Sequence, residues 1–185
     1  MSITQCRNRL LERIIPPAAE PVTLSAAKLY LRVDHNDEDD LINDCITASR
    51  MMAENWLRRS LLQQQWKLAY DEYAPFHVGL PMGPVQNVVS VVIVNQDNTE
   101  QTADESSYYL NGAKNALIFL QQISGFRVEI SYQTGYGNTA ADVPAPIRQG
   151  ILGQIADMYE NRADSISAIP PQVLALYMPF REVLL

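Results

Sequence analysis

The chain of 185 residues contains few cysteines and histidines, and its basic residues are outnumbered by acidic ones. These are the residue types that disulfide frameworks, zinc sites and nucleic-acid-binding surfaces need. Its two cysteines, Cys6 and Cys45, lie far apart with no CxxC spacing, so neither a disulfide framework nor a structural zinc site is expected, and a reducing intracellular setting fits. Lys and Arg number 14 against 21 Asp and Glu, which gives a net charge of -7. A protein that binds nucleic acid tightly needs a basic face, so this function is disfavoured. A surface that DNA slides past without sticking is compatible with the acidic charge.

Long hydrophobic runs are absent as well. The longest strongly apolar run, residues 88–94, is too short to cross a bilayer. Near the N-terminus, Arg7, Arg9 and Arg13 interrupt the chain before any apolar segment develops, so no signal peptide is expected. The sequence therefore predicts a soluble protein with no membrane partner.

Motifs for catalysis and cofactor binding are missing too. His35 and His77 have no HExxH or HxxxH partner, which argues against a zinc enzyme. There is no GxSxG elbow and no GxxxxGK[ST] phosphate loop. No pair of carboxylates lies in an apolar segment, where a raised pKa would mark an acid-base site. We therefore predict no catalytic residue, no metal ligand and no cofactor, and an enzyme is not expected.

Two segments match ligand motifs in part and fail at the positions that matter. A calcium loop that begins at Asp34 would have Asp39 at its sixth position, where Gly is needed, and Cys45 at its twelfth, where a bidentate Glu is needed. The solvated start of a helix is therefore expected over residues 34–40. Residues 135–140 fit GxGxxA, but prolines up to Pro146 delay the next helix. A dinucleotide site needs that helix to begin inside the motif, so a strand-to-helix turn is predicted instead.

What the sequence does have is the composition of a globular protein. Apolar residues make up 47% and charged residues 19%, and the length is sufficient to bury a core without disulfides or a metal. A chain of this size suits one domain, or one domain with a subdomain inserted in it.

The first sixty residues are predicted to form an arm and two helices. Residues 1–22 contain three prolines and favour an extended arm. Thr23 or Ser25 can cap a short helix, and Asn36 or Asp37 can cap a helix of about twenty residues. The apolar positions of the longer helix follow i, i+3, i+4 spacing and predict one buried face: Leu41, Ile42, Cys45, Ile46, Ser49, Met52, Ala53, Trp56 and Leu57.

The middle of the chain alternates polar and apolar residues, as strands do. The pattern predicts strands over residues 62–70, 88–94 and 126–132, and a hairpin over residues 108–120 around an Asn-Gly turn. Residues 75–84, rich in proline and glycine, and residues 95–105 are predicted to be loops. Together these segments predict a small antiparallel β subdomain.

Helical periodicity returns after Pro144 and Pro146, where it predicts a helix that ends near Arg162. A last short helix is predicted to open at Pro171 and to end at Pro179. The fold class is α+β, with a helical core of about four helices and an inserted small antiparallel β subdomain. The predicted segments are an N-terminal arm (1–22), a first helical core segment (23–60), the β insert (61–134), and a second helical core segment that includes a C-terminal docking segment (143–185).

Three local features have two interpretations. Arg58 and Arg59 form a basic spot, better explained by the dipole at a helix C-terminus than by a phosphate site. Trp56 and Trp66 fall on apolar faces, where core packing is the simplest explanation. Both chain ends carry apolar residues next to prolines, and such ends either fold back or dock on a partner.

Several short segments stand in a fixed order along residues 22–182. They are LSAAKLYLRVD at 24–34 with the acidic run after it, LLQQQW at 61–66, LP at 80–81 with PV at 84–85, YQTGYG at 132–137, and VPAPIRQ at 143–149 with YENR at 159–162. This ordered set resembles the phage head-tail connector family, also called head-completion or adaptor proteins, in the longer subfamily that carries a β insert.

The resemblance implies a structural virion protein with no cofactor and no catalysis. It implies a ring of about twelve copies beneath the portal protein, which joins the DNA-filled head to the tail and seats the tail or a stopper protein. DNA would pass through the channel without specific binding, and an acidic lining would repel its phosphates. The expected locations are the virion and, during assembly, the host cytoplasm, for either a bacteriophage or a prophage.

In such a ring the C-terminal segment would dock on the portal, through Tyr177, Met178, Pro179, Phe180, Val183, Leu184 and Leu185. Two alternatives stay open at this point. One is another tail or virion assembly protein. The other is a small-ligand-binding or enzymatic domain built on the β insert, which would need a concave polar pocket with perturbed titratable groups.

Overall fold

The structure, a computed structural model, describes residues 9–161 and 169–182. The chain divides into two compact units. The β unit comprises the residues up to Pro16 together with Gln63–Gly135, and the helical unit comprises Pro17–Leu62 together with the residues from Tyr136 onward. The α-helices thus lie in one unit and the antiparallel sheets in the other, and the predicted α+β class is confirmed.

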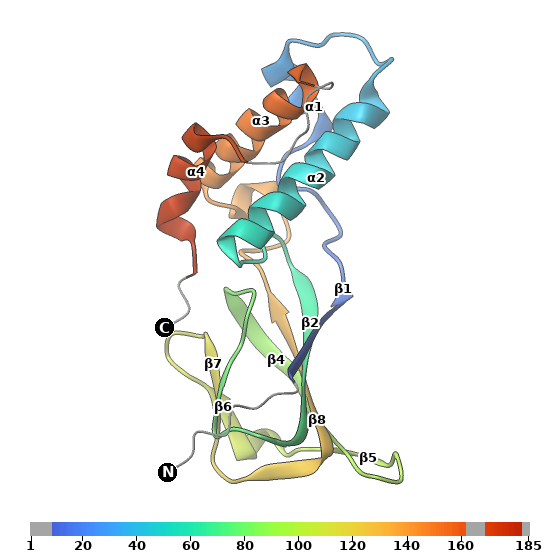
Figure 1. Ribbon diagram of the computed structural model, residues 1–185, viewed down its shortest axis with the longest axis vertical. Coiled ribbons are helices and arrows are strands. Elements are labelled where there is room, and N and C mark those ends of the chain that lie inside the picture. Colours follow the sequence, from blue (N-terminus) through green and yellow to red (C-terminus); the bar gives the residue numbers. More distant parts are fainter. Residues whose placement is uncertain (1–8, 162–168, 183–185) are drawn as a thin grey trace. The chain divides into compact units, whose positions relative to one another are not determined.

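The β unit contains two antiparallel sheets within its described residues (Figure 1). The larger has the strand order β1-β2-β8-β4-β5, and the smaller has the order β3-β7-β6. The elements are β1 (Arg9–Ile15), β2 (Gln64–Ala74), β3 (His77–Gly79), β4 (Val85–Val94), β5 (Glu100–Thr102), the short 3-10 helix η1 (Glu105–Ser107), β6 (Tyr108–Leu110), β7 (Ala116–Phe119) and β8 (Ile123–Thr134).

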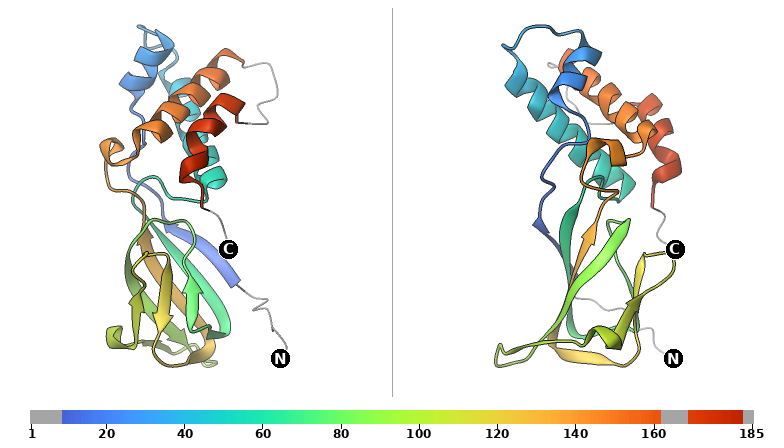
Figure 2. Two further views of the ribbon diagram at one scale, coloured as in Figure 1. Left: turned by 90° about the vertical axis from the view of Figure 1, so that its left-hand side faces the viewer. Right: turned by 180° about the vertical axis from the view of Figure 1, so that it is seen from behind.

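Two long strands, β2 and β8, form the centre of the larger sheet, and the views of Figure 2 show them side by side. Their register pairs Leu68 with Ile130 and Trp66 with Tyr132. Leu68, Ile130 and Tyr132 are fully buried, whereas Trp66 is half-buried and packs at the margin of this core. The alternation seen in the sequence therefore marks the inward face of these strands.

The predicted hairpin is confirmed as β6 and β7, with Tyr108 opposite Phe119. The Asn111 side chain closes its turn by accepting hydrogen bonds from the backbone amides of Asn115 and Ala116, at 3.0 and 3.1 Å. The loops predicted over residues 75–84 and 95–105 are wrong in part, because β3 and β5 lie within them. Each is a three-residue strand that exists through pairing with β7 or β4, so its own sequence carries no periodicity.

The segment predicted as an N-terminal arm is extended and mostly exposed, but it contacts the fold in both units. Arg9–Ile15 pairs with β2 as the edge strand β1. Within the helical unit, Val22 is buried in the core and Glu20 bonds a residue of the long helix. The prolines predict the extended backbone, but only the tertiary fold supplies the surfaces that this backbone covers.

The helical unit contains four α-helices within its described residues, and α2, α3 and α4 lie side by side (Figure 1). The elements are α1 (Leu24–Leu31), α2 (Asp39–Leu57), the 3-10 helix η2 (Ala140–Asp142), α3 (Ala145–Glu160), α4 (Pro171–Tyr177) and the 3-10 helix η3 (Met178–Phe180). The four predicted helices are therefore present. Pro179 lies inside η3, so the chain tightens into a 3-10 turn there instead of stopping.

Helix starts follow the sequence in one case and depart from it in the other. Thr23 caps α1 by accepting the amide of Ala26, as predicted. The predicted Asn36 or Asp37 cap of α2 is wrong, because the N-cap is Glu38 and makes no side-chain cap bond. Asn36 instead accepts a hydrogen bond at 2.7 Å from the Lys28 ammonium. The same ammonium group also binds Asp39, at 2.6 Å. A tertiary contact thus competes with local capping for this side chain.

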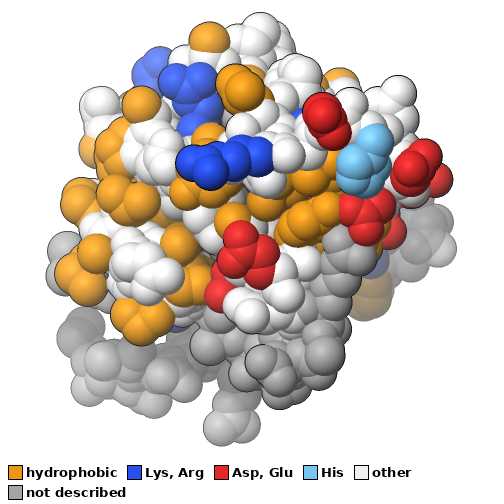
Figure 3. Space-filling view, turned by 90° about the horizontal axis from the view of Figure 1, so that it is seen from above, with side chains coloured by type: hydrophobic (Ala, Val, Ile, Leu, Met, Phe, Trp, Pro, Cys, Tyr) orange, Lys and Arg blue, Asp and Glu red, His pale blue; other side chains and the backbone are white. Residues whose placement is uncertain are grey.

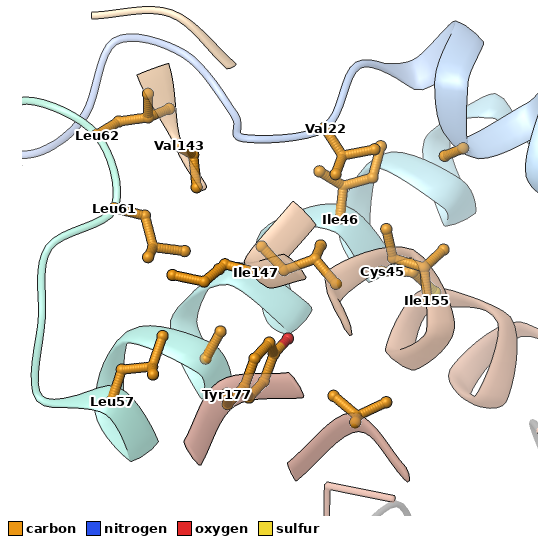
Figure 4. Close-up of a cluster of buried hydrophobic side chains, with 14 of the residues drawn as sticks. Val22, Cys45, Ile46, Leu57, Leu61, Leu62, Val143, Ile147, Ile155 and Tyr177 are labelled. Atoms are coloured by element: carbon orange, nitrogen blue, oxygen red, sulfur yellow. The ribbon is translucent and has the colours of Figure 1, made fainter. Parts of the chain in front are cut away.

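The core of the helical unit is an aliphatic cluster around one tyrosine (Figure 4). Tyr177 points from α4 into this cluster, toward Ile147. Its ring fills the space beside Gly150 of α3, where a Cβ atom would overlap the ring. Glycine is therefore needed at this position for close approach of α3 and α4 rather than for a positive φ.

We predict opposite effects for two alanine substitutions on α3. Gly150→Ala should lower the free energy of unfolding of the helical unit by about 1–3 kcal/mol, because the fully buried Tyr177 ring cannot move aside. Gly153→Ala should be neutral or raise it by up to about 1 kcal/mol, since its Cβ would sit 3.4 Å from Val173 and alanine favours helix. Urea unfolding followed by Trp56 fluorescence in a Trp66→Phe background measures both, and equal effects would refute the close-approach explanation.

Candidate partner-binding surface

A buried charge network holds the C-terminal half of α2. Arg50 and Glu54 form an ion pair at 3.1 Å with 7% and 3% of their side chains exposed. Arg50 also binds Glu20 at 2.7 Å, and Glu54 accepts the backbone amide of Leu61 at 3.0 Å. One network therefore joins the segment before α1, the long helix, and the turn that follows it.

Burial by itself would lower the pKa of Arg50. The hydrogen bond to Glu20 and the charge of Glu54 outweigh this effect and raise the pKa above its ordinary value. The guanidinium thus stays charged, and its partners compensate for its removal from water. Sequence periodicity missed both Arg50 and Glu54, because a charged residue on a helix is expected to face solvent.

The residues predicted for portal docking divide between the core and the surface. Tyr177 is fully buried, and its hydroxyl donates to the side-chain oxygen of Gln154 at 3.5 Å. Burial raises the pKa of the Tyr177 hydroxyl. Phe180 is half-buried and packs against the same core. The Tyr177 side chain is therefore unavailable to a partner in this conformation, which corrects its place in the docking set.

Two of the other residues in that set do face solvent. Met178 is 66% exposed, and Pro179 is exposed beside it. Val183, Leu184 and Leu185 lie outside the described residues. The surface role of the docking segment thus rests on Met178 and Pro179 among the residues that the structure describes.

Beside this segment, α2 and α4 border a hollow of about 580 Å³, which we name the Trp56 groove. The guanidinium of Arg181 lies over the Trp56 ring, 4.8 Å from its centroid. The backbone amide of Glu182 donates to the Leu57 carbonyl at 2.9 Å and fixes the chain there. The groove combines apolar side chains with two arginines and one amide: Met52, Asn55, Trp56, Arg58, Ile169, Leu174 and Arg181.

The two arginines predicted as a basic spot have different surroundings. Arg58 adopts a left-handed conformation, with φ of 57°, at the C-cap of α2 and is exposed in the groove. Arg59 is half-buried near Tyr136; burial raises the pKa of the Tyr136 hydroxyl, and Arg59 acts in the opposite direction. The helix C-terminus thus explains the position of both cations, and one of them is left for a partner.

The β unit has a polar hollow of similar size, lined by Asp71, Glu72, Asn95, Gln96, Gly125 and Phe126. Its lining includes no histidine, cysteine, lysine or arginine. The titratable residues of this lining are the two carboxylates, Asp71 and Glu72, and neither lies beside a basic side chain of the lining.

The glycine motif forms a turn, as predicted. Gly135 has a φ of 116°, and η2 and α3 begin only after residue 139. Asp142 accepts the amide and hydroxyl of Thr139, and these bonds lower its pKa. A Cβ on Gly137 would overlap the Asp142 carboxylate. The loop is therefore filled by its own side chains where a pyrophosphate would have to sit.

Among the described residues, no group of three or more His, Cys, Asp and Glu side chains could hold a metal ion. Cys45 is a free thiol in the core, and Cys6 lies outside the described residues. No helix within residues 9–161 and 169–182 is both long enough and apolar enough to cross a membrane.

Comparison with protein families identifies the group to which this fold belongs. The phage gp6-like head-tail connector protein family matches residues 21–123, more than half of the chain. The chain belongs to this family. Head-tail connectors are structural virion proteins, so the predicted family and the predicted connector function are confirmed. No curated protein matches the chain at the sequence level.

Solved structures share the fold over nearly the whole chain. A chain from the neck of an empty GTA particle, computed with C6 symmetry, is similar with a TM-score of 0.79 and 21% identity. A chain from the virion of a native gene transfer agent particle has a TM-score of 0.81 and 22% identity. A third, from the neck of a native GTA particle computed with C12 symmetry, has a TM-score of 0.70 and 22% identity. Each alignment covers 95% of this chain and 97% of the other.

We predict that Glu54→Gln lowers the free energy of unfolding of the helical unit by about 3 kcal/mol, because the buried Arg50 would lose its charged partner. Urea unfolding followed by Trp56 fluorescence measures this change. Glu12→Gln on the β unit is the control, and its unfolding is followed by Trp66 fluorescence in a Trp56→Phe background. Glu12 pairs with Lys67 at 3.2 Å but is 52% exposed, so its loss should cost at most about 1 kcal/mol. A comparable small change for both variants would refute the role assigned to the buried network.

Proposed function

We propose that this connector forms a closed ring beneath the portal protein of a phage or prophage particle, and that it joins the DNA-filled head to the tail. The observation that carries the proposal is the family match over residues 21–123. In this proposal the protein is a virion component without catalytic activity, it assembles from the host cytoplasm, and its helical unit is the connector core into which the β unit is inserted.

The symmetry of the similar particles supports a ring. Two of the similar chains come from necks computed with C6 and C12 symmetry. We therefore propose about twelve copies, related by heterologous contacts that close by rotation. The net charge of -7 supports a channel function, because an acidic wall repels phosphates and lets DNA pass without sticking.

We further propose that the C-terminal segment docks on the portal and that the opposite end of the ring receives a tail or stopper protein. Met178 and Pro179 present an exposed apolar surface, while Tyr177 and Phe180 anchor that surface to the core. A rigid anchor next to exposed apolar side chains lowers the conformational entropy lost on binding.

The native mass of the purified protein over a range of concentrations, alone and with the portal protein from the same genome, tests the ring. We expect a discrete assembly of about a dozen subunits, alone or on the portal. A monomer that ignores the portal at every concentration would overturn the proposed ring.

A second experiment tests the docking segment. Deletion of Pro179–Leu185 should abolish portal binding, but it also removes the contacts of Phe180 and Arg181 with the core. Met178→Lys changes only an exposed side chain and should weaken portal binding at least about tenfold, since it places a charge in an apolar contact. Leu120→Lys is its control, because Leu120 is 64% exposed on the β unit. Portal binding by Met178→Lys equal to that of the control would refute docking through Met178.

A further inference from the structure

The Trp56 groove has the chemistry of a protein-binding site. Its apolar side chains are contributed by α2, α4 and the residue pair before α4, and the exposed Arg58 gives it a positive rim. Arg181 covers one face of the Trp56 ring, so the indole is not a free stacking platform for a base. An occupant that suits these features combines exposed apolar side chains with carboxylates.

The chain carries such a surface at the other end of α2, which we name the α1–α2 corner. Leu29 is 82% exposed, Tyr30 is 43% exposed and Leu41 is 36% exposed. Asp37 has 93% of its side chain exposed, and Asp44 is exposed one helical turn after Leu41. Seen from above, acidic and apolar side chains lie together over the start of α2 (Figure 3).

The corner is acidic on balance. Lys28 is paired with Asp39 at 2.6 Å, so its charge is already neutralised. Of the other charged side chains here, the exposed aspartates outnumber the exposed Arg32: Asp34, Asp37, Asp40 and Asp44. The corner therefore matches the groove in both respects, because it combines exposed apolar side chains with charge of the opposite sign.

The two surfaces cannot meet within one molecule. Asp44 precedes Arg58 by 14 residues in one continuous helix, which separates them by about 21 Å along the helix axis. A contact between them must therefore join two copies. Because the two surfaces differ, such a contact is heterologous and propagates from copy to copy, as a ring requires.

We propose that the α1–α2 corner of one copy docks in the Trp56 groove of the next copy. This inference rests on the ring proposed above and assigns its subunit contact. Each copy then offers one corner and one groove, so the same contact can repeat from copy to copy around the ring. Arg58 faces the carboxylates of Asp37 and Asp44, and the exposed leucines of the corner fill the apolar part of the groove.

Charge reversal on each side tests the contact. Arg58→Glu places a carboxylate of the groove opposite the acidic corner, and the pair Asp37→Lys with Asp44→Lys places a basic corner opposite a basic groove. Each variant alone should need a roughly tenfold or higher protein concentration to assemble, because like charges would face each other. An equimolar mixture of the two variants should assemble as wild type does, since each reversed groove can then receive a reversed corner and each unchanged groove an unchanged corner. Native mass spectrometry should find the two variants in equal numbers in that assembly.

The β unit offers matched controls. Lys114→Glu reverses an exposed cation that also has a left-handed backbone, with φ of 51°. Glu100→Lys with Glu105→Lys reverses two exposed acids. These variants change the net charge by the same amounts and should assemble as wild type does, alone or on the portal.

Failure of this inference and failure of the ring have different signatures. If wild type stays monomeric and ignores the portal, the ring proposal and this contact both fall. If wild type assembles and Arg58→Glu assembles at the same concentration, the ring stands and the contact is wrong. An Arg58→Glu variant that assembles normally but loses binding to duplex DNA, or to a tail protein, would also overturn a second copy as the occupant of the groove.

Discussion

The helical unit depends on the buried pair of Arg50 and Glu54. This pair is unusual in that it connects three separate segments, through Glu20 before α1 and through the amide of Leu61 after α2. A buried ion pair adds little net stability over apolar packing, but breaking it is costly because one charge is then left without a partner. The pair therefore acts as a constraint on geometry. It fixes where α2 ends, and with that it fixes Leu57 and Arg58 at the edge of the Trp56 groove.

The C-terminal segment has two kinds of residue, some buried in the core and some exposed, as the proposed docking on a partner would require. Tyr177 fills the space beside Gly150 and joins α4 to α3, so it serves stability alone. Met178 and Pro179, directly after it, face solvent on a tight 3-10 turn. An exposed apolar residue is costly to keep in water unless a partner covers it, and a rigid anchor next to it keeps the cost of ordering low. The alternation of buried and exposed residues within a few positions fits an interface rather than a fraying end.

A connector needs shape, rigidity and surfaces for its neighbours, and the chemistry of this chain matches that need. Catalysis would require convergent titratable groups in a closed site. The hollows described here contain no such set, and the glycine turn after β8 is filled by Asp142. The charged residues instead hold segments together, as Arg50 and Glu54 do, or stand exposed at opposite ends of α2. The separation of acidic and basic ends along α2 gives the helical unit two different surfaces, which is suited to head-to-tail assembly.

Much of the fold could be predicted from the sequence, because periodicity reports which face of an element is buried. The i, i+3, i+4 pattern located the α2 face of Ile42, Cys45 and Ile46, strict alternation located β8, and the ordered segments indicated the connector family. The same pattern was wrong for Leu41, which is 36% exposed at the first turn of α2. Elements without their own pattern, such as β3 and β5, exist only through their partners. The burial of Arg50, Glu54 and Tyr177, and the groove beside Trp56, were likewise decided by the tertiary structure. A charge or an aromatic ring has no local signature of its partner, and that partner comes from a segment distant in the chain.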